Sequence, residues 1–106
     1  MHTDIAEKRQ ELIALCQRYD VARLEVFGSA ARGADFDPAH SDADFLVEFK
    51  PGSALPPLEQ FFGLAEALEK LLGRSVDLVE RQAIEKSRNY IRRRQVLSEA
   101  EAVYGA

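Results

Sequence analysis

The stretch SDADFLVEF, residues 41–49, decides the fold that this sequence predicts. Side chains alternate across a strand, so residues two apart share a face. One face would carry Asp42, Asp44, Leu46 and Glu48, and the other would carry Ala43, Phe45, Val47 and Phe49. The pattern predicts a strand over residues 42–49 that begins with two carboxylates and has one wholly apolar face.

The segments before this strand predict a helix, a short strand and a loop. Residues 4–19 have the spacing of an amphipathic helix, with Asp4 as its cap and Ile5, Leu12, Ile13, Leu15 and Cys16 as its inward stripe. Residues 23–27 predict a strand with Leu24 and Val26 on one side. Gly28-Ser29 follows at once, residues 30–32 are typical of a helix start, and residues 33–41 are rich in turn formers.

The segments after this strand predict a long helix, a third strand and a helical end. Residues 50–57 contain three prolines and a glycine and predict a loop, whereas residues 58–72 repeat apolar residues at helical spacing. Gly73 is placed for a C-cap, and residues 75–79 predict a strand with Asp77 on one face. Residues 83–104 favour helix, with a break near 87–89. We therefore expect one domain over residues 1–106, of α/β (α+β) class, with a small mixed sheet packed against helices.

Composition excludes several classes of protein. The chain has 106 residues and a net charge of −4, which argues against tight non-specific binding to DNA. It contains neither an apolar run of the roughly 20 residues needed to span a bilayer nor a recognisable signal peptide. Its single cysteine, Cys16, fits a core position in a protein of the reducing cytoplasm.

Three features together indicate a nucleotide and metal site. At Gly28 and Ser29 the backbone can approach an anion closely, although a Gly-Ser pair after a strand is by itself an ordinary turn. Asp42 and Asp44 can converge on hard cations, although an exposed acidic edge would have the same pattern. Asp77 interrupts an apolar strand and can complete the carboxylate set; its alternative is an edge charge that discourages aggregation.

The stretches that carry these features are VFGSAARG (26–33), SDADFLVEF (41–49) and GRSVDLVE (73–80). Their combination resembles the nucleotidyltransferase superfamily that includes polymerase-beta-like enzymes. More narrowly, it is similar to the minimal nucleotidyltransferase (MNT) group, the antitoxin-like partners of HEPN-domain proteins. The resemblance covers nearly the whole chain, including EAEAVYG (99–105). One departure is a slightly longer loop between Arg32 and Ser41.

The resemblance implies a nucleotidyltransferase-like fold and a role for each motif residue. Gly28 and Ser29 would hold the triphosphate of ATP. Asp42 and Asp44 would bind two Mg²⁺ ions, and Asp77 would bind one of them and help to activate the attacking hydroxyl. Two cations suit this chemistry because nucleotidyl transfer is an in-line displacement at phosphorus.

Basic residues near these motifs allow two interpretations each. Arg32 could contact the phosphates as a fixed positive charge, or serve the surface or a carboxylate. His40 could be a solvated loop residue or take part in acid–base chemistry. The arginine cluster could be a solvated helix face or a surface for a partner or phosphate. It comprises Arg88, Arg92, Arg93 and Arg94.

The chain has little room for a second, acceptor-recognising domain, and the resemblance implies that the acceptor is another protein. It would be a HEPN-type ribonuclease toxin whose tyrosine receives AMP, which makes this chain a type VII-like antitoxin. Two alternatives remain: an antitoxin that acts by binding only, and a nucleotidyltransferase for a small aminoglycoside-like molecule. Apolar residues of the 58–72 helix and of the C-terminal region could form the partner surface or pack in the core. The latter are Val96, Leu97, Val103 and Tyr104.

Overall fold

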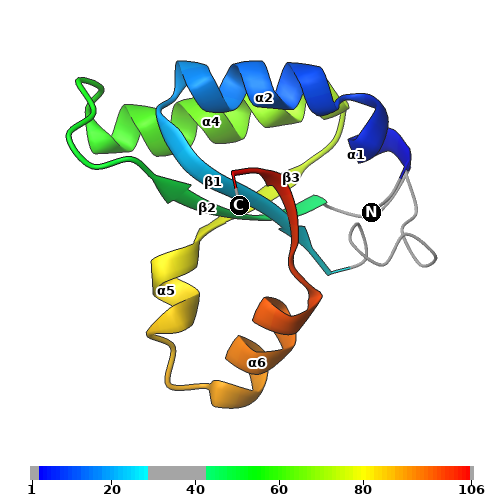
Figure 1. Ribbon diagram of the computed structural model, residues 1–106, viewed down its shortest axis with the longest axis vertical. Coiled ribbons are helices and arrows are strands. Elements are labelled where there is room, and N and C mark those ends of the chain that lie inside the picture. The colour runs from blue at the N-terminus through cyan, green and yellow to red at the C-terminus, as the bar shows by residue number, and fades with distance from the viewer. Residues whose placement is uncertain (1–2, 29–42, 106) are drawn as a thin grey trace.

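The structure is a computed structural model that describes residues 3–28 and 43–105. Within those ranges the strands form one sheet in the spatial order β3-β2-β1-β4 (Figure 1). They are β1 (Val21–Phe27), β2 (Ala43–Phe49), β3 (Val76–Glu80) and β4 (Glu101–Tyr104). β1 pairs antiparallel with β2 and with β4, whereas β2 and β3 run parallel. The predicted mixed sheet packed against helices is confirmed.

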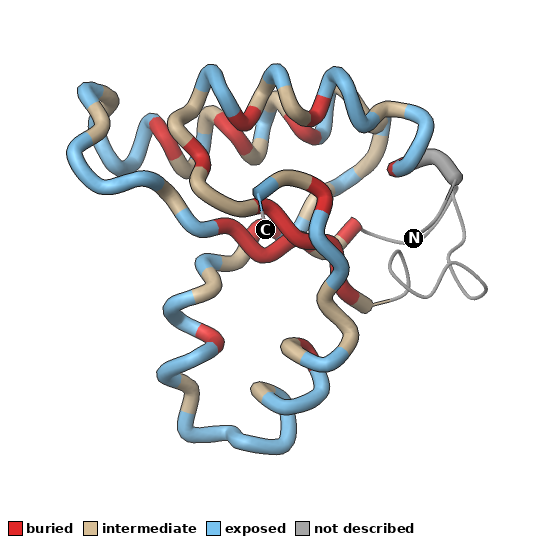
Figure 2. The backbone as a smooth tube through the Cα atoms, in the orientation of Figure 1, coloured by how far each residue is buried: buried red, intermediate tan, exposed pale blue. Residues whose placement is uncertain are grey.

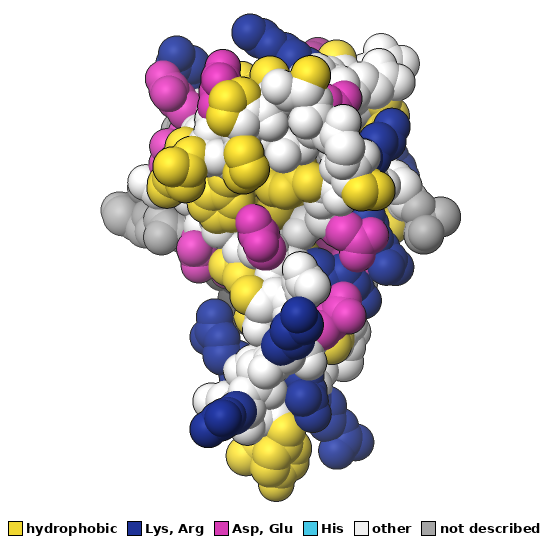
Figure 3. Space-filling model, turned by 90° about the vertical axis from the view of Figure 1, so that its left-hand side faces the viewer, with side chains coloured by type: hydrophobic (Ala, Val, Ile, Leu, Met, Phe, Trp, Pro, Cys, Tyr) yellow, Lys and Arg dark blue, Asp and Glu magenta, His cyan; other side chains and the backbone are white. Residues whose placement is uncertain are grey.

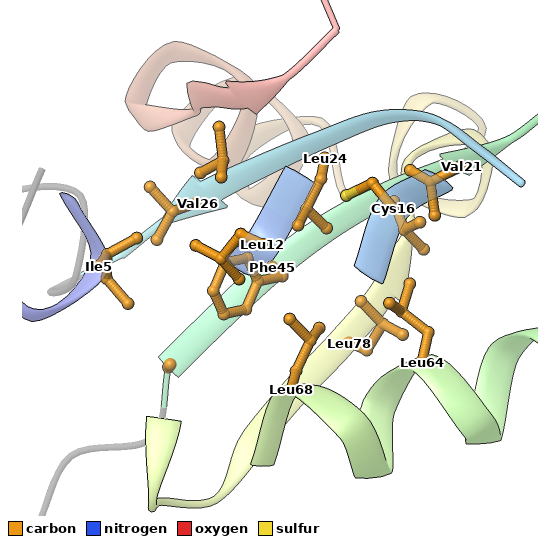
Figure 4. Packing of buried hydrophobic residues seen from close by; sticks show 13 residues of the cluster. Ile5, Leu12, Cys16, Val21, Leu24, Val26, Phe45, Leu64, Leu68 and Leu78 are labelled. Atoms are coloured by element: carbon orange, nitrogen blue, oxygen red, sulfur yellow. The ribbon is translucent and has the colours of Figure 1, made fainter. Parts of the chain in front are cut away.

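One face of the sheet forms the main core with α2 (Arg9–Arg18) and α4 (Pro57–Leu72), which lie side by side over it (Figures 1 and 4). The strands contribute Leu24, Val26, Ala43, Phe45, Val47 and Leu78, and the helices contribute Leu12, Cys16, Leu64 and Leu68. The alternation predicted for the central strands is confirmed. Cys16 is fully buried, as predicted, and this burial raises the pKa of its thiol to about 12.

The ends of α4 follow from local chemistry. Pro57 occupies the first turn, where its missing N–H leaves no helical bond unmade. Gly73 ends the helix with φ +68°, and its N–H donates to the carbonyl of Glu69 at 2.8 Å, so the predicted glycine cap is confirmed. The buried Gln60 donates from Nε2 to the carbonyl oxygen of Tyr19 at 2.8 Å, which fixes the start of α4 against the end of α2.

The opposite face of the sheet carries two short helices, α5 (Arg81–Glu85) and α6 (Tyr90–Glu99). They project away from the sheet and are exposed along most of their length, whereas the central strands are largely buried (Figure 2). A smaller cluster joins them to the sheet through Phe27, Leu46, Ile84 and Val96. The predicted break between these helices is confirmed at residues 86–89. None of the helices in the described ranges has the length and apolar character to cross a bilayer.

The predicted continuous helix over residues 4–19 is wrong at one point. Lys8 interrupts it with φ −102° and ψ 18°, so that α1 (Thr3–Glu7) and α2 are separate. The Lys8 N–H donates to the carbonyl of Ile5, three residues back, which tightens the turn. Asp4 lies inside α1, so its predicted place before the helix is also wrong. Ile5 and Leu12, one on each side of the break, are both fully buried in the same core.

The predicted helical end of the chain is wrong as well. Residues 101–104 form β4, which pairs with β1 on the side away from β2. Ala100 takes an extended conformation, with φ −63° and ψ 130°, and redirects the chain onto this edge. Val96 and Val103 are 5% and 2% exposed, so core packing, and not a partner surface, accounts for them. Leu97 and Tyr104 also pack against the two core clusters.

Candidate active site

Asp44 and Asp77 lie directly opposite one another on adjacent strands. The parallel register of β2 and β3 pairs Asp44 with Asp77, and neighbouring strands are about 4.8 Å apart. Both point away from the main core, because the residues that flank them in sequence belong to it or pack against it. Asp44 is half-buried and Asp77 is exposed. The sheet thus brings together two of the three predicted carboxylates, on the face that carries α5 and α6.

Gly28 lies against the Asp44 carboxylate. It follows β1 directly, and the preceding Phe27 pairs with Asp44 in the antiparallel register. Gly28 has φ +67°, a left-handed conformation that favours glycine, and a Cβ there would lie 2.7 Å from Asp44 Oδ2. The chain therefore needs glycine at this position for two independent reasons, backbone conformation and close approach to a carboxylate.

A cavity of about 280 Å³ opens between these residues and α6. It is lined by Phe27, Gly28, Asp44, Arg92, Gln95, Val96 and Glu99. The α6 residues recur at helical spacing and so share one face of the helix. Asn89 caps α6 by accepting a hydrogen bond from the Arg92 N–H at 3.2 Å, and Val96 packs the helix against the sheet. The α6 wall of the cavity therefore places a guanidinium, an amide and a carboxylate near Asp44, those of Arg92, Gln95 and Glu99.

The arginine cluster predicted from the sequence divides in the structure. Among the described residues that line this cavity, Arg92 is its one representative. Arg93 instead donates from Nη1 to the carbonyl of Ser87 at 3.2 Å. Gln95 and Glu99 did not stand out in the sequence. Their spacing from Arg92 was visible there, but the direction in which this helix faces depends on how it packs against the sheet.

A buried ion pair holds the end of β3 near the site. Glu25 lies on the same sheet face as Asp44, its side chain is 6% exposed, and it accepts a hydrogen bond from Arg81 Nη1. Arg23 Nε lies 3.5 Å from the same oxygen, and Arg81 also contacts Glu85 at 3.0 Å. Arg81 directly follows β3, so the pair links the strand that carries Asp77 to β1. The alternation of residues along β1 did not predict that Glu25 is buried in an ion pair, because both faces of this strand are covered.

Other predicted site residues lie outside the described ranges. They are Ser29, Arg32, His40 and Asp42. Among the described residues, no group of three or more histidine, cysteine or acidic side chains could hold a metal ion. The described strands supply two of the predicted carboxylates, Asp44 and Asp77, whose hard oxygen donors are the ligands that Mg²⁺ prefers.

The sequence is similar to those of known nucleotidyltransferases. A family model for the nucleotidyltransferase domain matches residues 9–101. A Thermococcus cleftensis protein named protein adenylyltransferase MntA is 41% identical over 70 residues, 66% of each chain. A Methanocaldococcus jannaschii protein, provisionally named a protein adenylyltransferase, is 35% identical over 81 residues, 76% of each chain.

Solved structures share the fold. A chain provisionally described as a minimal nucleotidyltransferase has a TM-score of 0.71 and 36% identity, and the match covers 95% of both chains. A chain of a toxin–antitoxin complex with AMP-PNP has a TM-score of 0.64 at 22% identity, over 92% of this chain and 73% of that one. A complex of a tri-AMPylated HEPN toxin with an MNT antitoxin from Shewanella oneidensis has a TM-score of 0.61 at 19% identity, over 96% and 73%. At these identities the last two comparisons speak for the fold alone.

Proposed function

Because this chain belongs to the nucleotidyltransferase domain family, we propose that it transfers AMP from ATP to a partner protein and thereby acts as an antitoxin. The observation that carries the proposal is Asp44 facing Asp77 across β2 and β3, with Gly28 against Asp44 at the edge of a cavity. Two adjacent carboxylates repel each other unless a cation lies between them. The nearby cavity offers room for a triphosphate, and Gly28 lines it without adding a side chain.

Asp42, Asp44 and Asp77 are the proposed ligands of two Mg²⁺ ions. Carboxylate oxygens fit a hard cation, and the parallel register of Asp44 and Asp77 allows both to contact one ion. Such ions, when bound, neutralise the phosphates and stabilise the attacking and leaving oxygens of an in-line displacement.

The remaining roles fall to this chain's own groups. Gly28 and Ser29 bind the triphosphate through their backbone and hydroxyl donors, and Arg92 supplies a positive charge from the α6 wall. Asp77 accepts the proton of the acceptor hydroxyl. The hydroxyl oxygen forms a bond to the α-phosphorus, the bond from that phosphorus to the bridging oxygen breaks, and pyrophosphate leaves.

The proposed acceptor is a tyrosine of a HEPN-domain toxin. Two relatives carry the name protein adenylyltransferase, and one structure of the same fold is a complex of an AMPylated HEPN toxin with an MNT antitoxin. The rival proposal is an antitoxin that neutralises its partner by binding alone. The Gly28–Asp44–Asp77 geometry favours chemistry, since binding alone would not need two carboxylates in register.

The test is intact mass spectrometry of a HEPN-domain protein supplied as the acceptor, after incubation with the chain, ATP and Mg²⁺. We expect the partner to gain the mass of one or more AMP groups. The isosteric variants Asp44→Asn and Asp77→Asn should fold and still bind the partner, but should not modify it. Glu48→Gln is the control, because it changes an exposed carboxylate on the same face of β2, outside the cavity. A complex that forms without any mass gain would establish the binding-only antitoxin.

A further inference from the structure

A second hollow lies on the other side of β3, between α4 and α5. We call it the α4–α5 groove; its volume is about 430 Å³. It is lined by Pro57, Leu58, Phe61, Phe62, Leu78, Val79, Glu80 and Ala83. Leu58 is 72% exposed and Phe62 is 62% exposed, which is unusual for large apolar side chains gathered at one place. Hydrophobic side chains gather on this face of the molecule, with acidic ones along their lower border (Figure 3).

The groove is held in shape by contacts behind it. The hydrogen bond from Gln60 to the Tyr19 carbonyl fixes the first turn of α4 against α2. The rings of Phe61 and Phe62 pack edge to face, with centroids 5.3 Å apart. The exposed apolar surface therefore belongs to an ordered wall, and a partner would not need to order it on binding.

Charge around the groove selects the chemistry of its occupant. Among the described lining residues only Glu80 is charged. Glu59, which is also exposed, adjoins the groove residue Leu58 in sequence. Arg81, the nearest cation in sequence, is already bound to Glu25 and Glu85. An apolar segment that carries lysine or arginine would thus meet acidic residues at the rim.

The groove also adjoins the candidate active site. Val79 lines the groove and lies two residues after Asp77 on β3, so the two share one strand face and are roughly 7 Å apart at the backbone. A peptide segment bound in the groove could therefore reach Asp77 within about two extended residues.

We propose that the α4–α5 groove binds the acceptor protein. An apolar or aromatic side chain of that protein, flanked by lysine or arginine, inserts between Phe62 and Val79, and this docking holds the modified hydroxyl beside Asp77. The inference rests on the proposed function, since it names the surface that presents the acceptor to that site.

The first test compares two double variants against the HEPN-domain protein used to test the proposed function. Leu58→Ser with Phe62→Ser should raise the KM for the partner and its Kd about tenfold, while the KM for ATP stays unchanged. Tyr90→Ser with Ile91→Ser is the matched control, because these side chains are 64% and 67% exposed at the tip of α6, away from the groove. An unchanged KM and Kd in the groove variant, or an equal effect of the control, would overturn the inference.

The second test identifies the occupant directly. A Phe62→Cys variant carries a benzophenone label that cross-links to whatever lies in the groove. The native Cys16 does not compete, because it is fully buried and its thiol pKa is raised to about 12. We expect cross-links to an apolar segment of the partner that contains lysine or arginine. Cross-links to a second copy of this chain, or to an acidic segment, would overturn the inference.

These measurements separate the inference from the proposed function. Binding of the partner that depends on the groove, without any AMP transfer by the wild-type chain, would reject the enzyme and retain the docking surface. AMP transfer that is unchanged when Leu58 and Phe62 are replaced would retain the enzyme and reject the docking surface. A wild-type chain that neither binds nor modifies this partner would reject both.

Discussion

Replacement of Gly28 by alanine should lower the thermal stability of the protein only moderately and the rate of AMP transfer strongly. The added Cβ would lie 2.7 Å from Asp44 Oδ2, and ordinary contacts begin at 3.4 Å, so the carboxylate must retreat by roughly 0.7 Å. The atom that must move is the end of a side chain, so the backbone can keep its path. The left-handed φ of +67° adds a conformational cost of about 1–2 kcal/mol for a residue other than glycine.

The conformational cost and the displaced carboxylate affect different quantities, the first Tm and the second the rate of AMP transfer. For a domain of this size, that cost lowers Tm by about 5–10 °C, which leaves the protein folded at room temperature. A displaced catalytic group has a larger effect on rate, because misplacement by about 1 Å can cost a hundredfold. We therefore expect Gly28→Ala to reduce the rate of AMP transfer by roughly 30- to 100-fold.

The matched control is Gly52→Ala. Gly52 has φ +78°, and a Cβ there meets no atom of the described residues within 4 Å, so this variant carries the conformational cost without the clash. Thermal unfolding and pyrophosphate release would be measured for both variants. The reasoning would be refuted if both lost similar stability and Gly28→Ala still transferred AMP as fast as Gly52→Ala.

Further predictions concern the cavity wall, the buried ion pair and the core thiol. Arg92→Ala should raise the KM for ATP about tenfold, because one charged contact is lost, whereas Arg94→Ala should leave this KM unchanged. If the two variants had the same KM for ATP, Arg92 would not belong to the site. Arg81→Met should lower the free energy of unfolding by about 3 kcal/mol, because among the described residues it leaves buried Glu25 with Arg23 alone as its cation. Adding Glu25→Leu should restore much of that loss in urea titrations. Cys16 ionises at an ordinary pKa of 9.0 when unfolded and at about 12 when folded, so wild-type stability should fall between pH 9 and 12 relative to Cys16→Ala; parallel curves would contradict this.

Some elements could be predicted because local pattern and tertiary environment agree. β2 alternates cleanly between two faces, and α4 has helical apolar spacing that ends at a glycine in a left-handed conformation. The break at Lys8 and the strand β4 could not be predicted this way. A four-residue strand has too little pattern of its own, and β4 forms because β1 offers a pairing edge about 75 residues earlier in the chain.

The sequence by itself determined which residues could do chemistry. The spacing of Asp42 and Asp44 along one strand was sufficient to predict that these two share a face, because side-chain alternation is a local property of the backbone, and Asp77 stood out as a carboxylate within an apolar strand. The register of Asp44 and Asp77, one directly opposite the other, was decided only by the pairing of β2 with β3.

The tertiary structure alone decided what surrounds that pair. It placed Arg92 of α6 beside Asp44, buried Glu25 against Arg81, and left Leu58 and Phe62 exposed in a groove next to Asp77. These contacts join residues that are distant in sequence. They depend on the angle and position at which each helix packs on the sheet, which is the outcome of many weak contacts and not of any local pattern.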